Sequence, residues 1–177
     1  LMNILLTSVG VRSYLVDYFK LEVKPGKVFT ADCDKYAPGN YNSDISFLVP
    51  EIKNPKYIPT LIELCRSNNI DAIVPLHDLD LPLLSENITK FSDIGTVVFV
   101  SPKEVINLCK DKLETFKFLK SNGFNTPRTY STLDSVKKDL DLNKIKFPLI
   151  SKSRKGYGSM DLQFVNDVSQ LNSLLPN

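Results

Sequence analysis

The chain has 177 residues, of which 42% are hydrophobic and 24% are charged, and its formal net charge is +2. These fractions are typical of a globular protein with one sizeable core, or with one domain and part of another. The small net charge predicts no nucleic-acid or anionic-membrane partner, and no apolar run is long enough to span a bilayer.

The cysteine and histidine content bears on the compartment and on metal binding. Three cysteines are far apart in the sequence: Cys33, Cys65 and Cys109. Their odd number and spacing favour a reducing, cytoplasmic location. No cysteine pair has metal-ligand spacing, and the single His77 cannot build a His-rich zinc site. The start shows no signal-peptide pattern, and we expect Met2 rather than Leu1 to be the native first residue.

The first half of the chain alternates between strand and helix patterns. Residues 3–8 form a nearly continuous apolar run, as a strand buried on both faces requires. Gly10 then turns the chain into a helical pattern. Further strands are expected in four places: 27–31, 45–49, 71–76 and 95–100. Amphipathic helices are expected from near Pro55 to Asn68, and as one helix from Asp80 through Phe91. This alternation predicts an open parallel α/β sheet over residues 2–108.

Polar residues follow several of these strands, at the edge where open α/β sheets bind ligands. Arg12 stands beside a helix N-terminus and could attract an anion. Asp78 and Asp80 follow the fourth strand and are substrate-binding candidates, although helix capping is slightly favoured for them. Asp32 ends the second strand, where a carboxylate suits a ribose, but G-x-G-x-x-G is absent, so a turn is favoured.

Two helix starts follow closely in the second half. Ser101 with Glu104, and then Asp111 with Glu114, have the N-cap and N3 spacing of a capping box. Lys112 therefore lies in a first helical turn, where the helix dipole disfavours a cation by roughly 0.3–1 kcal/mol. We expect a compensating anion beside it. Seven apolar residues of these helices are expected to be buried: Val105, Ile106, Leu108, Cys109, Leu113, Phe116 and Leu119.

The remaining elements lead to a hairpin. Residues 128–131 are expected as a short strand, 133–142 as a helix, and 167–175 as a final short helix. Residues 147–165 have the pattern of strand, loop and strand, and the loop at 154–160 has two glycines, two cations and no carboxylate. Such a loop suits a polyphosphate. A mobile surface hairpin with solvated cations is an equally good interpretation of the hairpin alone.

The stretch from "VSPKEVINLCKDKLETFKFLKSNGFNTPRTY" to "FPLISKSRKGYGS" resembles the opening of an ATP-grasp domain. In that superfamily a helix that begins with Asp-Lys, here Asp111-Lys112, precedes a strand lysine, here Lys152, and a glycine-rich loop. The preceding stretches "NILLTSVGVRSYLVDYFK" and "VPLHDLDLPLL" are similar to the carbamoyl-phosphate-synthase-like branch. The resemblance covers nearly the whole chain.

The resemblance implies a Rossmann-like pre-ATP-grasp domain at residues 2–108 and a partial ATP-grasp domain, its small N-terminal α+β subdomain, at 109–177. It implies that the phosphates of ATP contact two lysines and a covering loop: Lys112, Lys152, Gly156, Tyr157, Gly158 and Ser159. Arg154 and Lys155 are further candidates, which the family pattern does not fix. The adenine-binding hinge, the Mg²⁺ ligands and the late catalytic residues are expected beyond Asn177.

The implied function is the N-terminal part of a cytoplasmic MgATP-dependent ligase. It would join a small-molecule carboxylate, or bicarbonate, to an amine or ammonia through an acyl phosphate, and the chain alone is expected to be inactive. One alternative is a non-catalytic nucleotide- or metabolite-binding module that uses Asp32, Asp78 and Asp80. Another is a subunit that completes its ATP site with a partner chain, and a homodimer is also open. Without ATP, residues 154–160 are expected to be poorly ordered.

Overall fold

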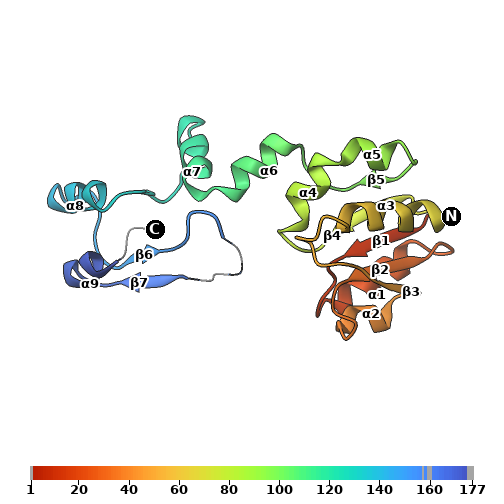
Figure 1. Cartoon of the computed structure of the whole chain (residues 1–177). Helices are drawn as coiled ribbons and strands as arrows, with labels where there is room; N and C mark the ends of the chain where they lie inside the picture. The colour runs from red at the N-terminus through yellow and green to blue at the C-terminus, as the bar shows by residue number, and fades with distance from the viewer. Residues whose placement is uncertain (1, 157, 159–160, 175–177) are drawn as a thin grey trace. The chain divides into compact units, whose positions relative to one another are not determined.

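The computed structural model describes residues 2–156, 158 and 161–174, and the chain divides into two compact units. Residues 1–106 form the first, called the α/β unit, and residues 107–177 form the second, called the hairpin unit (Figure 1). The expectations stated for Leu1, Tyr157 and Ser159 lie outside the described residues. Among the described helices, none is long and apolar enough to cross a membrane.

A five-stranded parallel sheet in the order β3-β2-β1-β4-β5 forms the centre of the α/β unit (Figure 1). The strands are β1 (Ile4–Thr7), β2 (Val28–Asp32), β3 (Ile45–Leu48), β4 (Ala72–Pro75) and β5 (Val97–Val98). The strand order changes direction between β1 and β4, which places a topological switch point beside the carboxyl end of β1. The predicted open parallel α/β sheet is confirmed.

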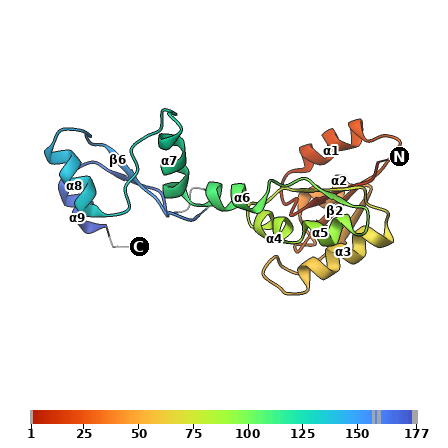
Figure 2. The same cartoon turned by 90° about the horizontal axis from the view of Figure 1, so that it is seen from above.

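Helices cover both faces of this sheet. Figure 2 shows α1 (Ser13–Glu22) on one side of the sheet and α3 (Tyr57–Ser67) on the other. The other helices in the first part of the chain are α2 (Pro38–Asn42), α4 (Asp80–Glu86), α5 (Ile88–Ser92) and α6 (Lys103–Lys110). The pattern after Asp80 predicted one helix, but Asn87 ends α4, and its amide Nδ2 donates to the carbonyl oxygen of Leu83 at 2.8 Å.

Successive strand residues enter two different cores, because side chains alternate between the faces of a sheet. On one face, Leu5, Phe29 and Ile73 pack with Leu61 of α3 and with the fully buried Phe91 of α5. On the other face, a second cluster includes Ile4, Leu6, Val28 and, from α1, Val16. Both faces of the inner strands are therefore apolar, which explains their nearly continuous hydrophobic runs.

The hairpin unit consists of short elements: α7 (Lys112–Ser121), α8 (Leu133–Asp141), β6 (Leu149–Ser151), β7 (Gln163–Val165) and α9 (Val168–Ser173). Strands β6 and β7 pair antiparallel, with Ile150 opposite Phe164. The strand predicted at 128–131 is wrong, because these residues have no ladder. Instead, the side chains of Arg128 and Tyr130 bind the same oxygen of Asp139 in α8, at 2.9 and 2.8 Å.

Little apolar surface is buried in the hairpin unit. Among its described residues, the hydrophobic side chains that are buried are Val165 and Leu171. Helices α6 and α7 hold no buried residue, so the burial predicted for their apolar residues is wrong, and these side chains are at most half-buried. N-caps are well formed instead: the side chains of Asp111, Thr132 and Asp167 accept backbone N–H bonds at the starts of α7, α8 and α9.

Candidate functional site

Lys112 connects the start of α7 with the glycine-rich loop. As the first residue of the helix, its backbone N–H has no acceptor within α7. It donates instead to the carbonyl oxygen of Arg154 at 3.1 Å, while its ammonium Nζ donates to the carbonyl oxygen of Gly156 at 3.0 Å. The expected partner of this cation was an anion. In the described part of the chain, the contact is a carbonyl dipole of the loop.

Arg154 fixes the loop to the same helical turn through its side chain. Its Nε lies 2.8 and 2.9 Å from the two carboxylate oxygens of Asp111, and its Nη2 lies 3.3 Å from Oε1 of Glu114. Lys155 Nζ is 3.9 Å from Oδ2 of Asp111. The bond from Arg154, together with the N–H groups of the helix start, lowers the pKa of Asp111 to about 2. Asp111 is thus a fixed negative charge, 7% exposed, beneath two loop cations.

The rest of the loop presents positive charge and accessible backbone. Lys152 lies one residue beyond β6, is exposed, and makes no hydrogen bond or ion pair with the residues that the structure describes. Gly158 has a φ of 66°, in the left-handed region that favours glycine. Arg154, Lys155 and Gly156 are exposed at their outer side.

The structure describes only part of the segment 154–160, for which poor order was predicted. Arg154 and Gly156 are held to α7 by the contacts just given. Tyr157, Ser159 and Met160 lie outside the described residues, and so does the part of the prediction that concerns them.

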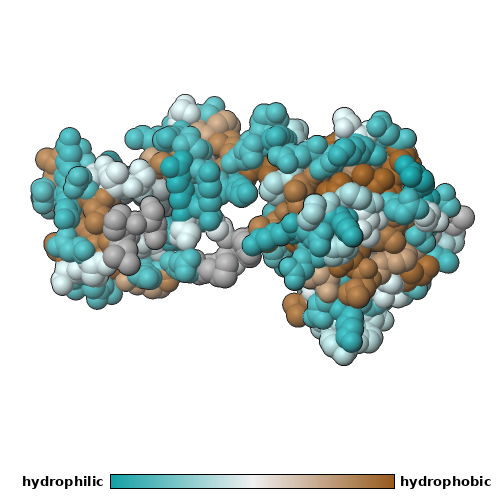
Figure 3. Space-filling view, in the orientation of Figure 1, coloured by the Kyte–Doolittle hydropathy of each residue, from teal (hydrophilic) through white to brown (hydrophobic). Residues whose placement is uncertain are grey.

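The hairpin carries an exposed apolar face next to these cations. Ile150 is 55% exposed and Phe164, directly opposite it on β7, is 65% exposed. Lys152 follows Ile150 by two residues, and residues two apart in a strand direct their side chains to the same face. Figure 3 shows hydrophobic side chains at the viewed surface of both units, interspersed with hydrophilic ones. A flat apolar surface beside a cationic loop suits a ligand with an aromatic part and an anionic part.

Asp80 is not the open or capping residue that the sequence suggested. The N-cap of α4 is Leu79, and Asp80 is the first helical residue with a fully buried side chain. Its Oδ1 accepts from the hydroxyl of Tyr57 at 2.7 Å, and its Oδ2 accepts from Oγ1 of Thr7 at 2.8 Å. Burial, reinforced by this carboxylate, raises the pKa of Tyr57. The carboxylate joins β1, α3 and α4 inside the fold and has no side open to a ligand.

The other candidates of the α/β unit lie at the carboxyl edge of the sheet. Arg12 occupies the N-cap position of α1 but makes no capping bond with its side chain. Asp78 is exposed in the turn before α4. Nδ1 of His77, in the same turn, accepts from the N–H of Leu79 at 3.1 Å. At this edge Arg12 is half-buried and Asp78 is exposed.

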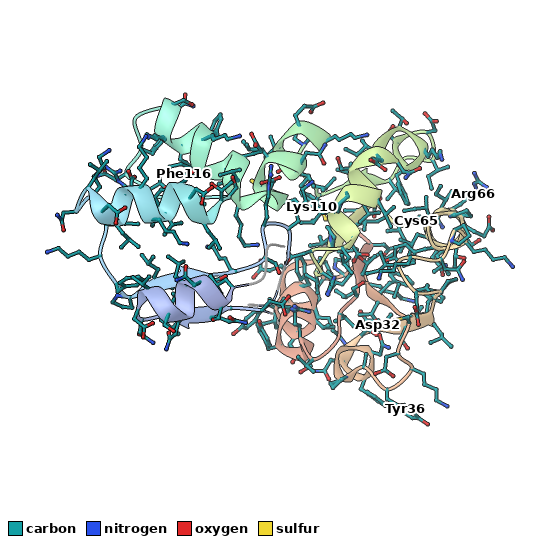
Figure 4. The ribbon with its side chains drawn as sticks, turned by 60° about the vertical axis from the view of Figure 1, so that its left-hand side comes forward. Asp32, Tyr36, Cys65, Arg66, Lys110 and Phe116 are labelled. Atoms are coloured by element: carbon teal, nitrogen blue, oxygen red, sulfur yellow. The ribbon has the colours of Figure 1, made fainter. Side chains whose placement is uncertain are left out.

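Asp32 has the turn role that the sequence favoured. Its two oxygens accept from the N–H groups of Gly10 and Asp34, each at 2.9 Å, and the residue is 7% exposed. Figure 4 shows Asp32 within the fold at the end of β2, whereas Tyr36 points outward from the following loop. These two bonds hold the carboxylate against the turn, and the low exposure of the residue leaves little of it accessible to a ribose.

The described residues do not fit a magnesium ion. They contain no group of three or more His, Cys, Asp or Glu side chains that could hold a metal. Near the loop, Asp111 is bound by Arg154, and Glu114 is bound by Lys117 at 2.8 Å. Both carboxylates are therefore already neutralised by cations.

Sequence reasoning missed the partner of Arg154. The pattern identified Asp111 only as a helix N-cap, and it identified Arg154 only as a loop cation. Helix capping and an ion pair with a residue 43 positions later use the same carboxylate, and only the second is non-local. The one available signal was the unusual cation at Lys112, which predicted a contact in this region but not its chemistry.

A parallel α/β unit followed by a helix and a hairpin that both carry loop-facing cations has the form of the first part of an ATP-grasp protein. Residues 4–99 match the family described as PylC-like, N-terminal domain, and the chain belongs to this family. Carbamoyl-phosphate synthase from Methanobrevibacter smithii is 30% identical over 135 residues, which are 72% of this chain and 34% of that protein. The predicted membership of the ATP-grasp superfamily is confirmed.

Solved structures share the fold over nearly the whole chain. N5-carboxyaminoimidazole ribonucleotide synthetase from Thermotoga maritima matches with a TM-score of 0.69 and 18% identity, over 100% of this chain and 44% of its own. The Staphylococcus aureus enzyme complexed with ADP has a TM-score of 0.67 and 19% identity, over 97% and 43%. For the L-amino acid ligase from Bacillus licheniformis the values are 0.62 and 18%, over 97% and 40%. The chain thus spans less than half the length of these proteins.

Proposed function

We propose that the chain is the N-terminal part of an ATP-dependent ligase, which joins a carboxylate or bicarbonate to an amine or ammonia. Its relatives include carbamoyl-phosphate synthase and an L-amino acid ligase. The observation that carries the proposal is the cluster at the glycine-rich loop. There, Lys112 of α7 contacts the carbonyl oxygen of Gly156, and Lys152 lies just before the loop, exposed and without a hydrogen bond or ion pair to the described residues.

In this proposal the loop and the two lysines bind the phosphates of ATP. Lys112 and Lys152 supply point charges, and the backbone N–H groups at Gly156 and Gly158 supply directional donors. Positive groups held in place stabilise a phosphoryl group during transfer mainly by position and electrostatics. The carboxylate would receive the γ-phosphoryl group to give an acyl phosphate, which the amine then attacks with release of phosphate.

The exposed apolar face of the hairpin supports a nucleotide rather than a simple phosphate. Ile150 and Phe164 offer a surface on which a purine ring could lie, on the strand that leads to Lys152. Stacking of a base on an aromatic side chain contributes about 1–3 kcal/mol in other proteins. The hairpin would thus contact the base as well as the phosphates, while the adenine-binding hinge is proposed in the part of the relatives that this chain does not span.

Magnesium would supply positive charge that neutralises part of the charge of the ATP phosphates. Because the described residues hold no metal site, its ligands are proposed in the part of the relatives that this chain does not span, or in a partner chain. Substrate contacts by Arg12 and Asp78 remain proposals of the same kind. A cytoplasmic location is supported by the three cysteines, which are all free.

The test is ATP affinity in the full-length natural protein, measured by calorimetry. Lys152→Ala is expected to weaken ATP binding by roughly tenfold or more, since it removes a charge-assisted contact. Lys138→Ala, an exposed α8 lysine without a contact in the described structure, is the matched control and should leave the affinity unchanged. An unchanged affinity in Lys152→Ala would remove this residue from the site.

The non-catalytic binding module is separated by a second titration with NAD. That alternative relied on Asp32, Asp78 and Asp80, and the carboxylates of Asp32 and Asp80 are buried and hydrogen-bonded inside the α/β unit. Tight NAD binding without ATP binding would favour it. The absence of ADP release with any carboxylate and amine pair would count against a ligase.

A further inference from the structure

The start of the glycine-rich loop is held in place by polar contacts rather than by a hydrophobic core. Neither α7 nor the exposed segment from Arg154 to Gly156 contributes a buried apolar side chain. Yet backbone and side chain of Arg154 both bind the first turn of α7, and Lys112 binds Gly156. This concentration of contacts at one turn needs an explanation.

We infer that Arg154 is a positioning residue: held by Asp111, it fixes the start of the loop on α7 and thereby keeps Lys112 beside the loop backbone before any nucleotide binds. The consequence for ATP rests on the proposed function. The positioning itself does not, because it concerns contacts within this chain.

The Asp111 carboxylate is a rigid anchor. Its Oδ1 accepts from the N–H groups of Leu113 and Glu114 at 3.1 and 3.2 Å, so the helix start fixes its orientation. It is 7% exposed, whereas the side chain of Arg154 is 51% exposed. The guanidinium therefore has one edge held by a nearly buried anion and the rest directed to solvent. Its low pKa keeps the carboxylate ionised, in agreement with this role.

The neighbouring Lys155 provides a comparison on the same anchor. Its Nζ lies 3.9 Å from Oδ2 of Asp111, and its side chain is 64% exposed. By contrast, Nε of Arg154 lies within 2.9 Å of both oxygens of Asp111. A guanidinium is planar and presents several donors in a fixed arrangement, but an ammonium is a flexible point charge. Position is therefore assigned to Arg154 and not to Lys155.

The backbone N–H of Lys112 reports on this contact directly. A first-turn N–H has no acceptor in its own helix, and here the acceptor is the carbonyl oxygen of Arg154. Its exchange with solvent should be slow only while the loop is docked. NMR solvent exchange at this amide therefore measures docking without any ligand.

The experiment compares Arg154→Ala, Arg154→Lys and Asp111→Asn with the unchanged protein. Asparagine caps helices about as well as aspartate, so Asp111→Asn removes the charge and retains the cap. We expect the Lys112 amide to exchange about two- to fivefold faster in Arg154→Ala and in Asp111→Asn than in the unchanged protein. In Arg154→Lys we expect an exchange rate between that of Arg154→Ala and that of the unchanged protein. The control is Arg128→Ala, which removes another ion pair of the hairpin unit, and should leave this amide unchanged. Unchanged exchange in Arg154→Ala would overturn the inference.

ATP titration of the same full-length variants separates the two proposals. If Arg154→Ala accelerates exchange and weakens ATP binding together, both stand. If exchange accelerates but the unchanged protein binds no ATP, the positioning stands and the proposed function fails. If Arg154→Lys restores full ATP affinity while the Lys112 amide still exchanges fast, ATP binding depends on the charge of residue 154 and not on its position, which would overturn the consequence for ATP and leave the positioning in place.

Discussion

The two units of the chain are stabilised in different ways. The α/β unit has two hydrophobic clusters on either side of a parallel sheet. The described part of the hairpin unit buries two hydrophobic side chains, Val165 and Leu171, and relies on capped helix starts and ion pairs. Hydrophobic burial is large and insensitive to direction, whereas caps and ion pairs are small and geometric.

Because the two units are stabilised differently, we expect their stability to be sensitive to different kinds of mutation. In the α/β unit, loss of volume in the core should dominate, and surface charges should matter little. In the hairpin unit, single polar groups should have local effects out of proportion to their size, because few apolar contacts support the same elements. We therefore expect the largest effect on stability from the loss of a core side chain and the smallest from the loss of a single ion pair.

The largest effect is expected from Phe91→Ala in α5. The ring is fully buried in the cluster that packs against α3, so its removal should lower the free energy of unfolding by about 3–5 kcal/mol. Urea denaturation followed by circular dichroism measures it. Phe99→Ala is the control, since that ring is 61% exposed, and a loss below about 0.5 kcal/mol is expected there. Equal losses in the two variants would contradict the contrast.

Tyr57→Phe should have the next effect. Removal of the hydroxyl leaves Oδ1 of the buried Asp80 without its donor, at a cost of about 1–3 kcal/mol. The same denaturation experiment applies. Tyr41→Phe, at a 72% exposed residue of α2, serves as the matched control and should change little. An unchanged free energy of unfolding in Tyr57→Phe would mean that Asp80 accepts a hydrogen bond from another donor.

Asp167→Ala tests a cap in the unit with little core. Its Oδ1 accepts from the N–H of Gln170 at 2.8 Å, and loss of such a cap typically costs about 0.5–2 kcal/mol. We expect the amides of α9 to lose hydrogen-exchange protection while those of β1 do not. Ser173→Ala, at the other end of the same helix, is the control. Loss of protection in β1 would show that the cap supports more than α9.

The smallest expected effect is the release of the loop from α7 at acidic pH. The pKa of Asp111 is about 2 in the fold, below its ordinary value near 4. A lowered pKa means a stabilising contribution that is fully present above pH 4 and is lost as the pH falls towards 2. Solvent exchange at the Lys112 amide, compared between these pH values after correction for intrinsic rates, should show this release. Loss of docking already near pH 5 would point to a different group.

The sequence predicted the α/β unit well because its signals are local and repeated. Apolar runs at β1 and β2, the turn at Gly10 and the amphipathic α3 each specify their own element, and parallel strand order follows from alternation. The split between α4 and α5 was missed, since Asn87 has no pattern of its own. The short α2 was missed for a different reason: Pro38 and Gly39 have the composition of a loop.

The hairpin unit was harder to predict, and so was the site. The caps at Asp111 and Asp167 have recognisable spacing, but the supposed strand at 128–131 depended on whether a partner strand existed. The family motif identifies Lys112 and Lys152 as candidates, and their contact with ATP phosphates stays a prediction. The Arg154–Asp111 pair could not be predicted, because nothing in the sequence separates a loop cation in solvent from one bound to a distant carboxylate.

The register of β6 and β7 has a further consequence. Leu149 pairs with Val165 on one face, and Ile150 pairs with Phe164 on the other, so both faces of this two-stranded ribbon are apolar. A shift by one residue would exchange the two faces, and the burial of Val165 on one of them specifies the register. An exposed apolar strand pair is also a template for edge-to-edge association. Solubility of this chain at high concentration therefore depends on what covers Ile150 and Phe164.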